Sequence, residues 1–233
     1  MIGLTIDGKG IETEEGSTIM DAALENGIRI PGLCHLQGLT PYGMCRVCAV
    51  EVKGVPNPLM ACVTPVREGM EVTTDSDEIR EHRKLAVELL LAERTHICSV
   101  CVANGNCELQ DLADELGVDH VDFERGWPRH PVDSTHSFLV LDRNRCILCT
   151  RCVRVCDEIE GAHTLDLMMR GRESQVMIDM DRMWGESTTC TSCRKCAKVC
   201  PVGAIYAEDE PISMTKDDQI ARFILDRRQA RHD

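Results

Sequence analysis

The sequence predicts an α+β protein made of three small domains and a C-terminal tail. Only 3% of its 233 residues are aromatic, so few large rings are available to fill a hydrophobic core. Fifteen residues are cysteine. Small domains with limited apolar volume are often stabilised by bound metal. The cysteines form separate groups among segments of strand and helix pattern. The predicted divisions are 1–75, 76–120 and 136–208, with 209–233 as a tail that forms a helix from Asp217.

The first 75 residues have the element order of a β-grasp domain. An Asp7-Gly8 turn between two extended segments predicts a β-hairpin. Ser17 is placed to cap a helix that stops at Gly27, and a cysteine-containing loop and further strands follow. Strands are predicted at 3–6, 10–13, 47–52, 59–63 and 70–74.

The second domain is predicted to be helical. Asp75 opens a long helix, with Glu78 in the capping-box position three residues later. One face of this helix is expected to pack in the core, and it carries Ile79, His82, Ala86, Leu89 and Leu90. A second helix follows Cys107 and ends at Gly117.

The third domain contains an internal repeat. A strand, a cysteine loop and a helix begin at Phe138, and a second cysteine loop and helix begin near Ser187. The loop-like segment 117–137, with two prolines and many charges, separates this repeat from the helical domain. The sequence therefore predicts two related metal-binding loops in one small domain.

The first group of candidate ligands is Cys34, Cys45, Cys48 and Cys62. A 2Fe–2S cluster needs four thiolates, and a tight C-x2-C loop with two more distant cysteines can supply them. Gly43 and the short residues after it would let backbone amides approach the sulfurs. Four thiolates also suit structural zinc, although such zinc sites usually use two C-x2-C pairs. The pattern favours 2Fe–2S, with zinc as the alternative.

The second group is His96, Cys98, Cys101 and Cys107. Three closely spaced cysteines supply three corners of a 4Fe–4S cluster, and His96 is the nearest residue that could supply the fourth. A lone histidine is more often a core or surface residue, but the three-cysteine group is otherwise incomplete. An imidazole in place of a thiolate removes negative charge and is expected to raise the reduction potential.

The third and fourth groups are two copies of the C-x2-C-x2-C-x3-C run of two-cluster bacterial ferredoxins. In such runs the fourth cysteine binds the other cluster, because it lies on the helix after its own loop. One cluster is therefore predicted on Cys146, Cys149, Cys152 and Cys200, and the other on Cys190, Cys193, Cys196 and Cys156. Pro201 follows the second run, whereas Asp157 follows the first.

These assignments use every cysteine once, together with one histidine, and they predict an electron carrier. A disulfide framework fits poorly, because the cysteine number is odd and no secretory leader is expected before the first strand. No apolar run approaches the roughly 20 residues that span a bilayer. The net charge of −13 disfavours nucleic acid as a partner. No G-x-G-x-x-G turn or P-loop is present, so catalytic residues are not expected in this chain.

The order of these groups resembles the front of the large iron–sulfur subunit of respiratory complex I and of iron-only hydrogenases. The single residue between His96 and Cys98, and the segments at 131–136 and 141–146, are most similar to the diaphorase iron–sulfur subunit of NAD-linked bidirectional nickel–iron hydrogenases. The complex I subunit and the iron-only hydrogenases typically have three residues between this histidine and the first cysteine, and they continue into a further domain beyond the position of Asp233.

The resemblance implies an electron-transfer subunit of a hydrogen:NAD(P)+ oxidoreductase. It implies one 2Fe–2S and three 4Fe–4S clusters, a partner subunit that carries FMN and NAD(H), and a nickel–iron hydrogenase small subunit, all in the cytoplasm. An electron-input subunit of an NAD-linked formate dehydrogenase or complex I-like enzyme is the alternative. A redox sensor and a structural zinc protein are the other classes, and the first would need a DNA-binding or signalling module that the sequence lacks.

Overall fold

The N-terminal part of the chain is a five-stranded mixed sheet crossed by one helix. The computed structural model describes residues 1–210 and Ile224. Strands β1 (Ile2–Ile6) and β2 (Lys9–Thr13) form the predicted hairpin, and β1 pairs in parallel with β5 (Met70–Thr73). Strands β3 (Ala49–Val52) and β4 (Leu59–Met60) complete the sheet in the order β2-β1-β5-β3-β4.

Helix α1 (Ile19–Glu25) begins one residue later than the sequence predicted. The cap is Thr18 rather than Ser17, because the side chain of Thr18 accepts the amide of Asp21 while the Asp21 carboxylate accepts the amide of Thr18. The amide of Ser17 donates instead to the Glu14 carbonyl. The helix stops at the Asn26–Gly27 pair, where Gly27 has a φ of +71°.

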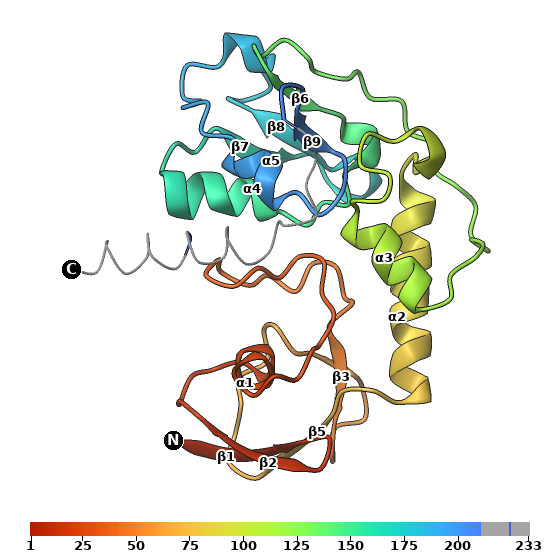
Figure 1. Cartoon of the computed structure of the whole chain (residues 1–233), viewed down its shortest axis with the longest axis vertical. Coiled ribbons are helices and arrows are strands. Elements are labelled where there is room, and N and C mark those ends of the chain that lie inside the picture. The colour runs from red at the N-terminus through yellow and green to blue at the C-terminus, as the bar shows by residue number, and fades with distance from the viewer. Residues whose placement is uncertain (211–223, 225–233) are drawn as a thin grey trace.

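Helix α2 (Asp77–Glu93) runs along the side of the molecule from the N-terminal sheet to the C-terminal part (Figure 1). Its cap is Ser76, whose hydroxyl accepts the amide of Ile79, so the predicted capping box of Asp75 and Glu78 was wrong. Asp75 instead pairs with Arg80.

The predicted core face of α2 was partly wrong. Ile79 is fully buried, as predicted, but Leu89 is 47% exposed. Arg83 and Val87, one and two turns after Ile79, are buried instead. The guanidinium of Arg83 donates to the backbone carbonyls of Val47, Ala49 and Thr74. A charged residue therefore occupies the core face because it satisfies carbonyls at the ends of strands β3 and β5. His82 lies at the margin, as predicted.

The C-terminal part contains two short antiparallel strand pairs and the two cysteine loops. Strand β6 (Leu139–Leu141) pairs with β9 (Ile205–Ala207), and β7 (Leu165–Met168) pairs with β8 (Gln175–Ile178). Helix α4 (Arg151–Arg154) continues into a π-helical turn at Val155–Glu160, and α5 (Lys195–Val199) follows the second loop. Helix α3 (Glu108–Glu115) lies between these loops and α2 (Figure 1).

One hydrophobic core joins the cysteine loops of all three predicted domains. Leu33 and Cys34 from the loop between α1 and β3 pack in the same buried cluster as Leu109 of α3 and Cys152 of α4. Figure 1 shows that this loop faces the C-terminal part. No helix within residues 1–210 has the length and apolar character needed to cross a membrane. The predicted tail helix lies outside the described residues, apart from Ile224, which is buried with Leu39 and Val155.

Candidate iron–sulfur sites

The four predicted ligand groups come together in space, each within its own part of the fold. All fifteen cysteines belong to the described chain, and none forms a disulfide. Three of the groups each ring a separate small cavity. The fourth group is buried beside the N-terminal sheet.

Cys34, Cys45, Cys48 and Cys62 form the buried group. All four are at most 5% exposed, and the sulfurs of Cys48 and Cys62 are 3.3 Å apart, well beyond the S–S bond length of about 2.05 Å. The Leu33 amide points at the sulfur of Cys45 at 3.4 Å. Contact with the Cys34 sulfur, together with burial, raises the pKa of Cys45 and of Cys62. Four thiols this close can all ionise only when cations offset their charge.

Gly43 shows why the loop before Cys45 can fold tightly. It has a φ of +64°, which favours glycine, and a Cβ on it would lie 3.2 Å from the side chain of Val63. The next turn also uses a left-handed residue, Arg46, with a φ of +61°. Beside these turns, the Cys48 sulfur meets that of Cys62 and the Cys45 thiol contacts that of Cys34.

His96, Cys98, Cys101 and Cys107 line one cavity together with Gln110, Arg145 and Gly203. Burial lowers the pKa of His96 to about 4, so the imidazole is neutral at neutral pH. Its Nε2 atom is buried and has no hydrogen-bond partner in the described part of the chain, while the Leu90 carbonyl interacts with the ring. A buried nitrogen atom that has no hydrogen-bond partner lowers the stability of the folded protein. A metal ligand is therefore the role that this nitrogen fits.

Gly203 closes the wall of the same cavity. A Cβ on Gly203 would lie 3.1 Å from the Cys101 sulfur and 3.0 Å from the Cβ of Ala103. Glycine therefore permits the second ferredoxin-like loop to approach the cysteine loop of the helical part closely. The Glu108 amide, just after Cys107, donates to the Pro201 carbonyl at 2.9 Å and holds the two loops together.

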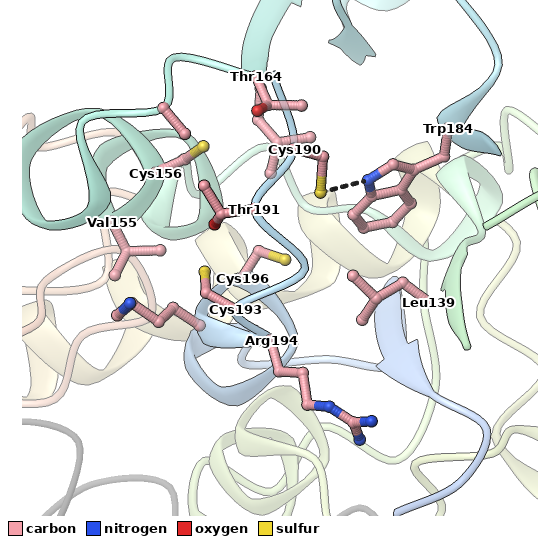
Figure 2. A pocket seen from close by; sticks show the side chains of 13 residues that line it. Leu139, Val155, Cys156, Thr164, Trp184, Cys190, Thr191, Cys193, Arg194 and Cys196 are labelled. Carbon is pink, nitrogen blue, oxygen red and sulfur yellow. Dashed lines mark hydrogen bonds between the residues drawn. The ribbon is translucent and has the colours of Figure 1, made fainter. Parts of the chain in front are cut away.

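The two cysteine runs ring two cavities in the crossed arrangement. One cavity is lined by Cys146, Cys149 and Cys152 of the first run with Cys200 of the second. The other is lined by Cys156 of the first run and the first three cysteines of the second (Figure 2). Burial raises the pKa of Cys146 to about 11 and of Cys149 to about 12. As in the first group, these thiols need bound cations in order to ionise.

The two runs share an unusual backbone that the sequence did not predict. The residues two and four positions after the first cysteine have left-handed φ angles in both loops, and none of them is glycine: Leu148 at +53°, Thr150 at +61°, Ser192 at +58° and Arg194 at +63°. Alternating right- and left-handed residues direct successive amides to one side and form an anion-binding nest. The Leu148 amide lies 3.4 Å from the Cys146 sulfur. Amides directed at sulfur offset the cost of these angles.

The two runs leave their helices differently. Pro201 ends α5, because proline offers no backbone donor to a continuing helix, and Cys200 lies just past the helix end. Asp157 allows the first helix to continue as a π-helical turn that contains Cys156. The π-helical turn, a feature often found at functional sites, carries Cys156 to the other loop's cavity.

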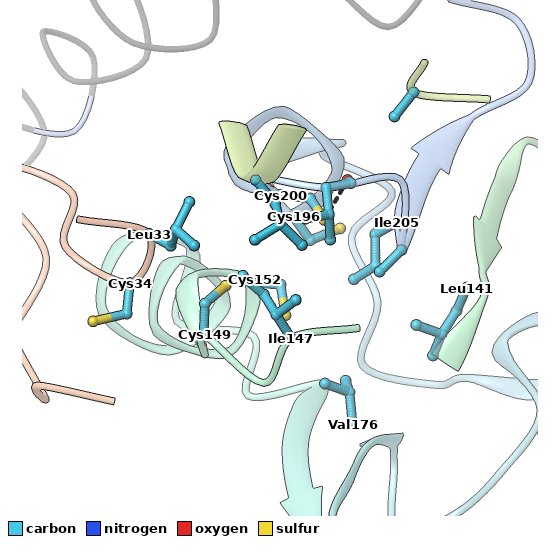
Figure 3. Close-up of a cluster of buried hydrophobic side chains, with 14 of the residues drawn as sticks. Leu33, Cys34, Leu141, Ile147, Cys149, Cys152, Val176, Cys196, Cys200 and Ile205 are labelled. Atoms are coloured by element: carbon cyan, nitrogen blue, oxygen red, sulfur yellow. Dashed lines mark hydrogen bonds between the residues drawn. The ribbon is translucent and has the colours of Figure 1, made fainter. Parts of the chain in front are cut away.

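Two buried arginines of α4 connect the N-terminal cysteine loop to the first ferredoxin-like loop. The Arg154 guanidinium donates to the carbonyls of Cys34 at 2.5 Å, Cys149 at 3.0 Å and Thr40 at 2.7 Å. Arg151 pairs with Glu108 at 2.8 Å and lies 3.4 Å from the Gly32 carbonyl. Figure 3 shows Leu33 and Cys34 beside Cys149 and Cys152. Sequence reasoning missed both arginines, because most of their partners lie 43 to 120 residues away.

In three of the four groups, the donors surround a cavity rather than meeting at a point. Within the described residues, no three histidine, cysteine, aspartate or glutamate side chains are grouped closely enough to hold a single metal ion. Rings of four sulfur or imidazole donors around an open space suit a polynuclear cluster with several metal atoms. The residues present therefore fit iron–sulfur clusters, which supply one-electron transfer when bound.

Three family models match consecutive parts of the chain. They describe a 2Fe-2S iron-sulfur cluster binding domain at residues 1–77, an NADH-ubiquinone oxidoreductase-G iron-sulfur binding region at 83–122, and the ferredoxin-like domain of NADH-quinone oxidoreductase subunit 3 at 137–206. The chain therefore has a mixed α/β fold with 2Fe–2S ferredoxin-like and 4Fe–4S domains.

Relatives of two sizes match most of the chain. The NADPH-Fe(3+) oxidoreductase subunit alpha of Geobacter sulfurreducens is 38% identical over 89% of the chain, but the chain spans only 24% of that protein. The NAD-reducing hydrogenase HoxS subunit gamma of Cupriavidus necator is 37% identical over 92% of both chains.

A solved structure matches the same length of chain. The crystal structure of an NAD+-reducing NiFe-hydrogenase in the H2-reduced state contains a chain with a TM-score of 0.84 and 33% identity, and the match covers 91% of this chain and 89% of that one. The resemblance drawn from the cysteine spacing is confirmed. The chain belongs to the family of the gamma subunit of NAD-reducing hydrogenase, an iron–sulfur electron-transfer subunit whose domains also match family models of NADH-ubiquinone and NADH-quinone oxidoreductase subunits.

Proposed function

We propose that this chain relays single electrons between an FMN- and NAD(H)-binding diaphorase partner and a nickel–iron hydrogenase module. It would act within a hydrogen:NAD(P)+ oxidoreductase and would contain no active site of its own. Three segments would carry the clusters: a β-grasp domain at 1–75, a helical domain at 76–120 and a two-cluster ferredoxin-like domain at 136–208. The match over 92% of the C. necator gamma subunit supports this assignment.

One observation carries the proposal. Each of three cavities is lined by a complete set of four predicted donors, and the buried N-terminal group supplies the fourth set. The proposed clusters are one 2Fe–2S on Cys34, Cys45, Cys48 and Cys62, and three 4Fe–4S on the remaining sets. His96, with its unpartnered Nε2, would complete the second set. Structural zinc fits less well, because its four ligands must lie about 2.0–2.3 Å from one ion.

The contacts of α4 support a place for the 2Fe–2S site in the relay. A single guanidinium, that of Arg154, donates to the carbonyls of Cys34 and Cys149, which belong to two different ligand sets. We therefore place the 2Fe–2S site next to the Cys146 site rather than on a distant branch. The common core that contains Cys34 and Cys152 also supports this order.

A second candidate is an electron-input subunit of a complex I-like enzyme or an NAD-linked formate dehydrogenase. The family descriptions of the second and third segments, which name NADH-quinone oxidoreductases, favour it. Both candidates are proposed to act in the cytoplasm with the same clusters and the same FMN- and NAD(H)-binding partner. They differ in the enzyme module at the other end of the relay.

Two measurements test the proposal. Anaerobic reconstitution of the chain should give roughly fourteen iron atoms per chain, two from one 2Fe–2S and twelve from three 4Fe–4S clusters. A folded chain that binds zinc but no iron would contradict the cluster assignment. Affinity purification of the native complex should then yield hydrogen-dependent reduction of NAD+ or NADP+. Formate-dependent or quinone-dependent activity without hydrogenase activity would favour the second candidate.

A further inference from the structure

Trp184 is the largest fully buried side chain of the described chain, and it faces one ligand set. Its indole Nε1 donates to the sulfur of Cys190 at 3.3 Å, and the ring lines the cavity of the Cys190 set (Figure 2). The residue is only 1% exposed. Figure 2 shows the indole directed toward Cys190 from the side of the cavity opposite Cys156.

Contacts from a distant segment hold the indole in this position. The amide of Trp184 donates to the Asp133 carboxylate at 2.7 Å, and the amide of Gly185 donates to the Thr135 hydroxyl at 2.8 Å. The ring of His136 lies 5.7 Å from the indole ring, centre to centre. A donor fixed by backbone contacts does not need to reorganise when the charge on the sulfur changes.

The other ferredoxin-like cavity has no such indole. Besides its four cysteines, the Cys146 cavity is lined by six aliphatic residues and Thr150. The sulfur of Cys146 is approached by the backbone amide of Leu148 at 3.4 Å. The indole therefore distinguishes two sites whose ligand spacing is the same.

We propose that Trp184 tunes the Cys190-set cluster by raising its reduction potential above the value that the ligands alone would give. The inference rests on the cluster assignment in the proposed function. Reduction adds one negative charge to a cluster, and a hydrogen bond to a ligand sulfur stabilises that charge. A hydrogen bond to a charged acceptor contributes enough to change an equilibrium about tenfold. Trp184 is thus a positioning residue that acts through Cys190.

The first test compares Trp184→Phe with Trp127→Phe in reconstituted protein. Trp127 is the only other tryptophan and is 50% exposed, so it serves as a matched control. At a fixed solution potential, the ratio of reduced to oxidised Cys190-set cluster should fall about tenfold in Trp184→Phe, or about 59 mV for a one-electron couple. The other three clusters and the Trp127→Phe protein should keep their potentials in a titration followed by electron paramagnetic resonance.

A second measurement does not depend on the folding of the Trp184 variant. In the Trp127→Phe protein labelled with 15N-indole tryptophan, Trp184 is the only labelled ring. Pulsed electron paramagnetic resonance should then detect a 15N coupling and an exchangeable proton on one cluster only. That cluster should be the one whose signal changes in Cys193→Ser.

The outcomes separate this inference from the proposed function. Absence of iron from the folded protein would overturn the proposed function and the inference together. Normal iron content with an unchanged Cys190-set potential in Trp184→Phe, or with no 15N coupling, would overturn the inference alone. A shift shared by all four clusters would also overturn it, because a general structural disturbance would then be the cause.

Discussion

Replacing Arg154 with methionine is expected to destabilise the protein by about 4 kcal/mol, because two buried carbonyls would each lose a charged donor worth about 1.5 kcal/mol and one partly buried carbonyl would lose about 1 kcal/mol. The carbonyls belong to Cys34, Thr40 and Cys149 and stay in place when the guanidinium is removed. Methionine fills a similar volume, so the cavity left behind is small. Loss of the buried charge recovers some desolvation free energy, but the stranded carbonyls outweigh it.

This loss can be measured by thermal unfolding. For a chain of this size, 1 kcal/mol corresponds to about 2–4 °C, so the unfolding temperature at one scan rate should fall by about 8–16 °C. Arg154→Lys keeps the charge but has a single donor group. Its unfolding temperature should therefore lie between those of Arg154→Met and the native protein. The signals of the 2Fe–2S and Cys146-set clusters should broaden together in electron paramagnetic resonance, since both loops lose their common tether.

Arg80→Met is the matched control for this prediction. Arg80 makes two hydrogen bonds to Asp75, but its side chain is 61% exposed. Exposed ion pairs contribute little to stability, so this variant should unfold at the native temperature. Equal unfolding temperatures for Arg80→Met and Arg154→Met would refute the claim that Arg154 ties the two loops together.

Three further substitutions test the ligand assignments. Cys156→Ser should weaken the cluster of the Cys190 set, and loss of the Cys146-set signal instead would contradict the crossed arrangement. His96→Cys should keep its cluster but lower the potential, because a thiolate adds negative charge; an unchanged potential and spectrum would argue against ligation by His96. Gly203→Ala should press on the Cys101 sulfur and remove up to about four iron atoms per chain from the His96 site, and full iron content with a native spectrum would show that the loop can move aside.

The ligand groups could be predicted from the sequence because they are local. A C-x2-C-x2-C loop wraps its own cavity through the geometry of seven consecutive residues, so spacing alone carries the information. The hairpin turn at Asp7-Gly8 and the helix stop at Gly27 were also predicted, because glycine at positive φ is a local signal. Element bounds still moved by one to three residues, as at β4, which ends at Met60, and at Thr18, where the capping hydroxyl could belong to either of two neighbours.

The contacts between the loops could not be predicted from the same patterns. The buried face of α2 was misassigned because hydrophobic periodicity counts arginine as exposed. Arg83 is buried because it donates to carbonyls 34 to 36 residues away. The left-handed angles at Leu148 and Arg194 were missed because neither residue is glycine. At Leu148 this conformation points the amide at the Cys146 sulfur, which is a property of the completed site.

This division between local and distant information bears on how such a relay is tuned. The ligands determine that electrons can pass, whereas the potentials of the individual clusters determine how readily each transfer occurs. In this chain the residues placed to adjust individual sites are Trp184 at Cys190 and Arg154 at Cys34 and Cys149. None of these contacts is encoded in cysteine spacing. Two relatives with the same fifteen cysteines are therefore expected to differ in the potentials of individual clusters, and so in the rates of transfer between them, through changes at positions outside the ligand motifs.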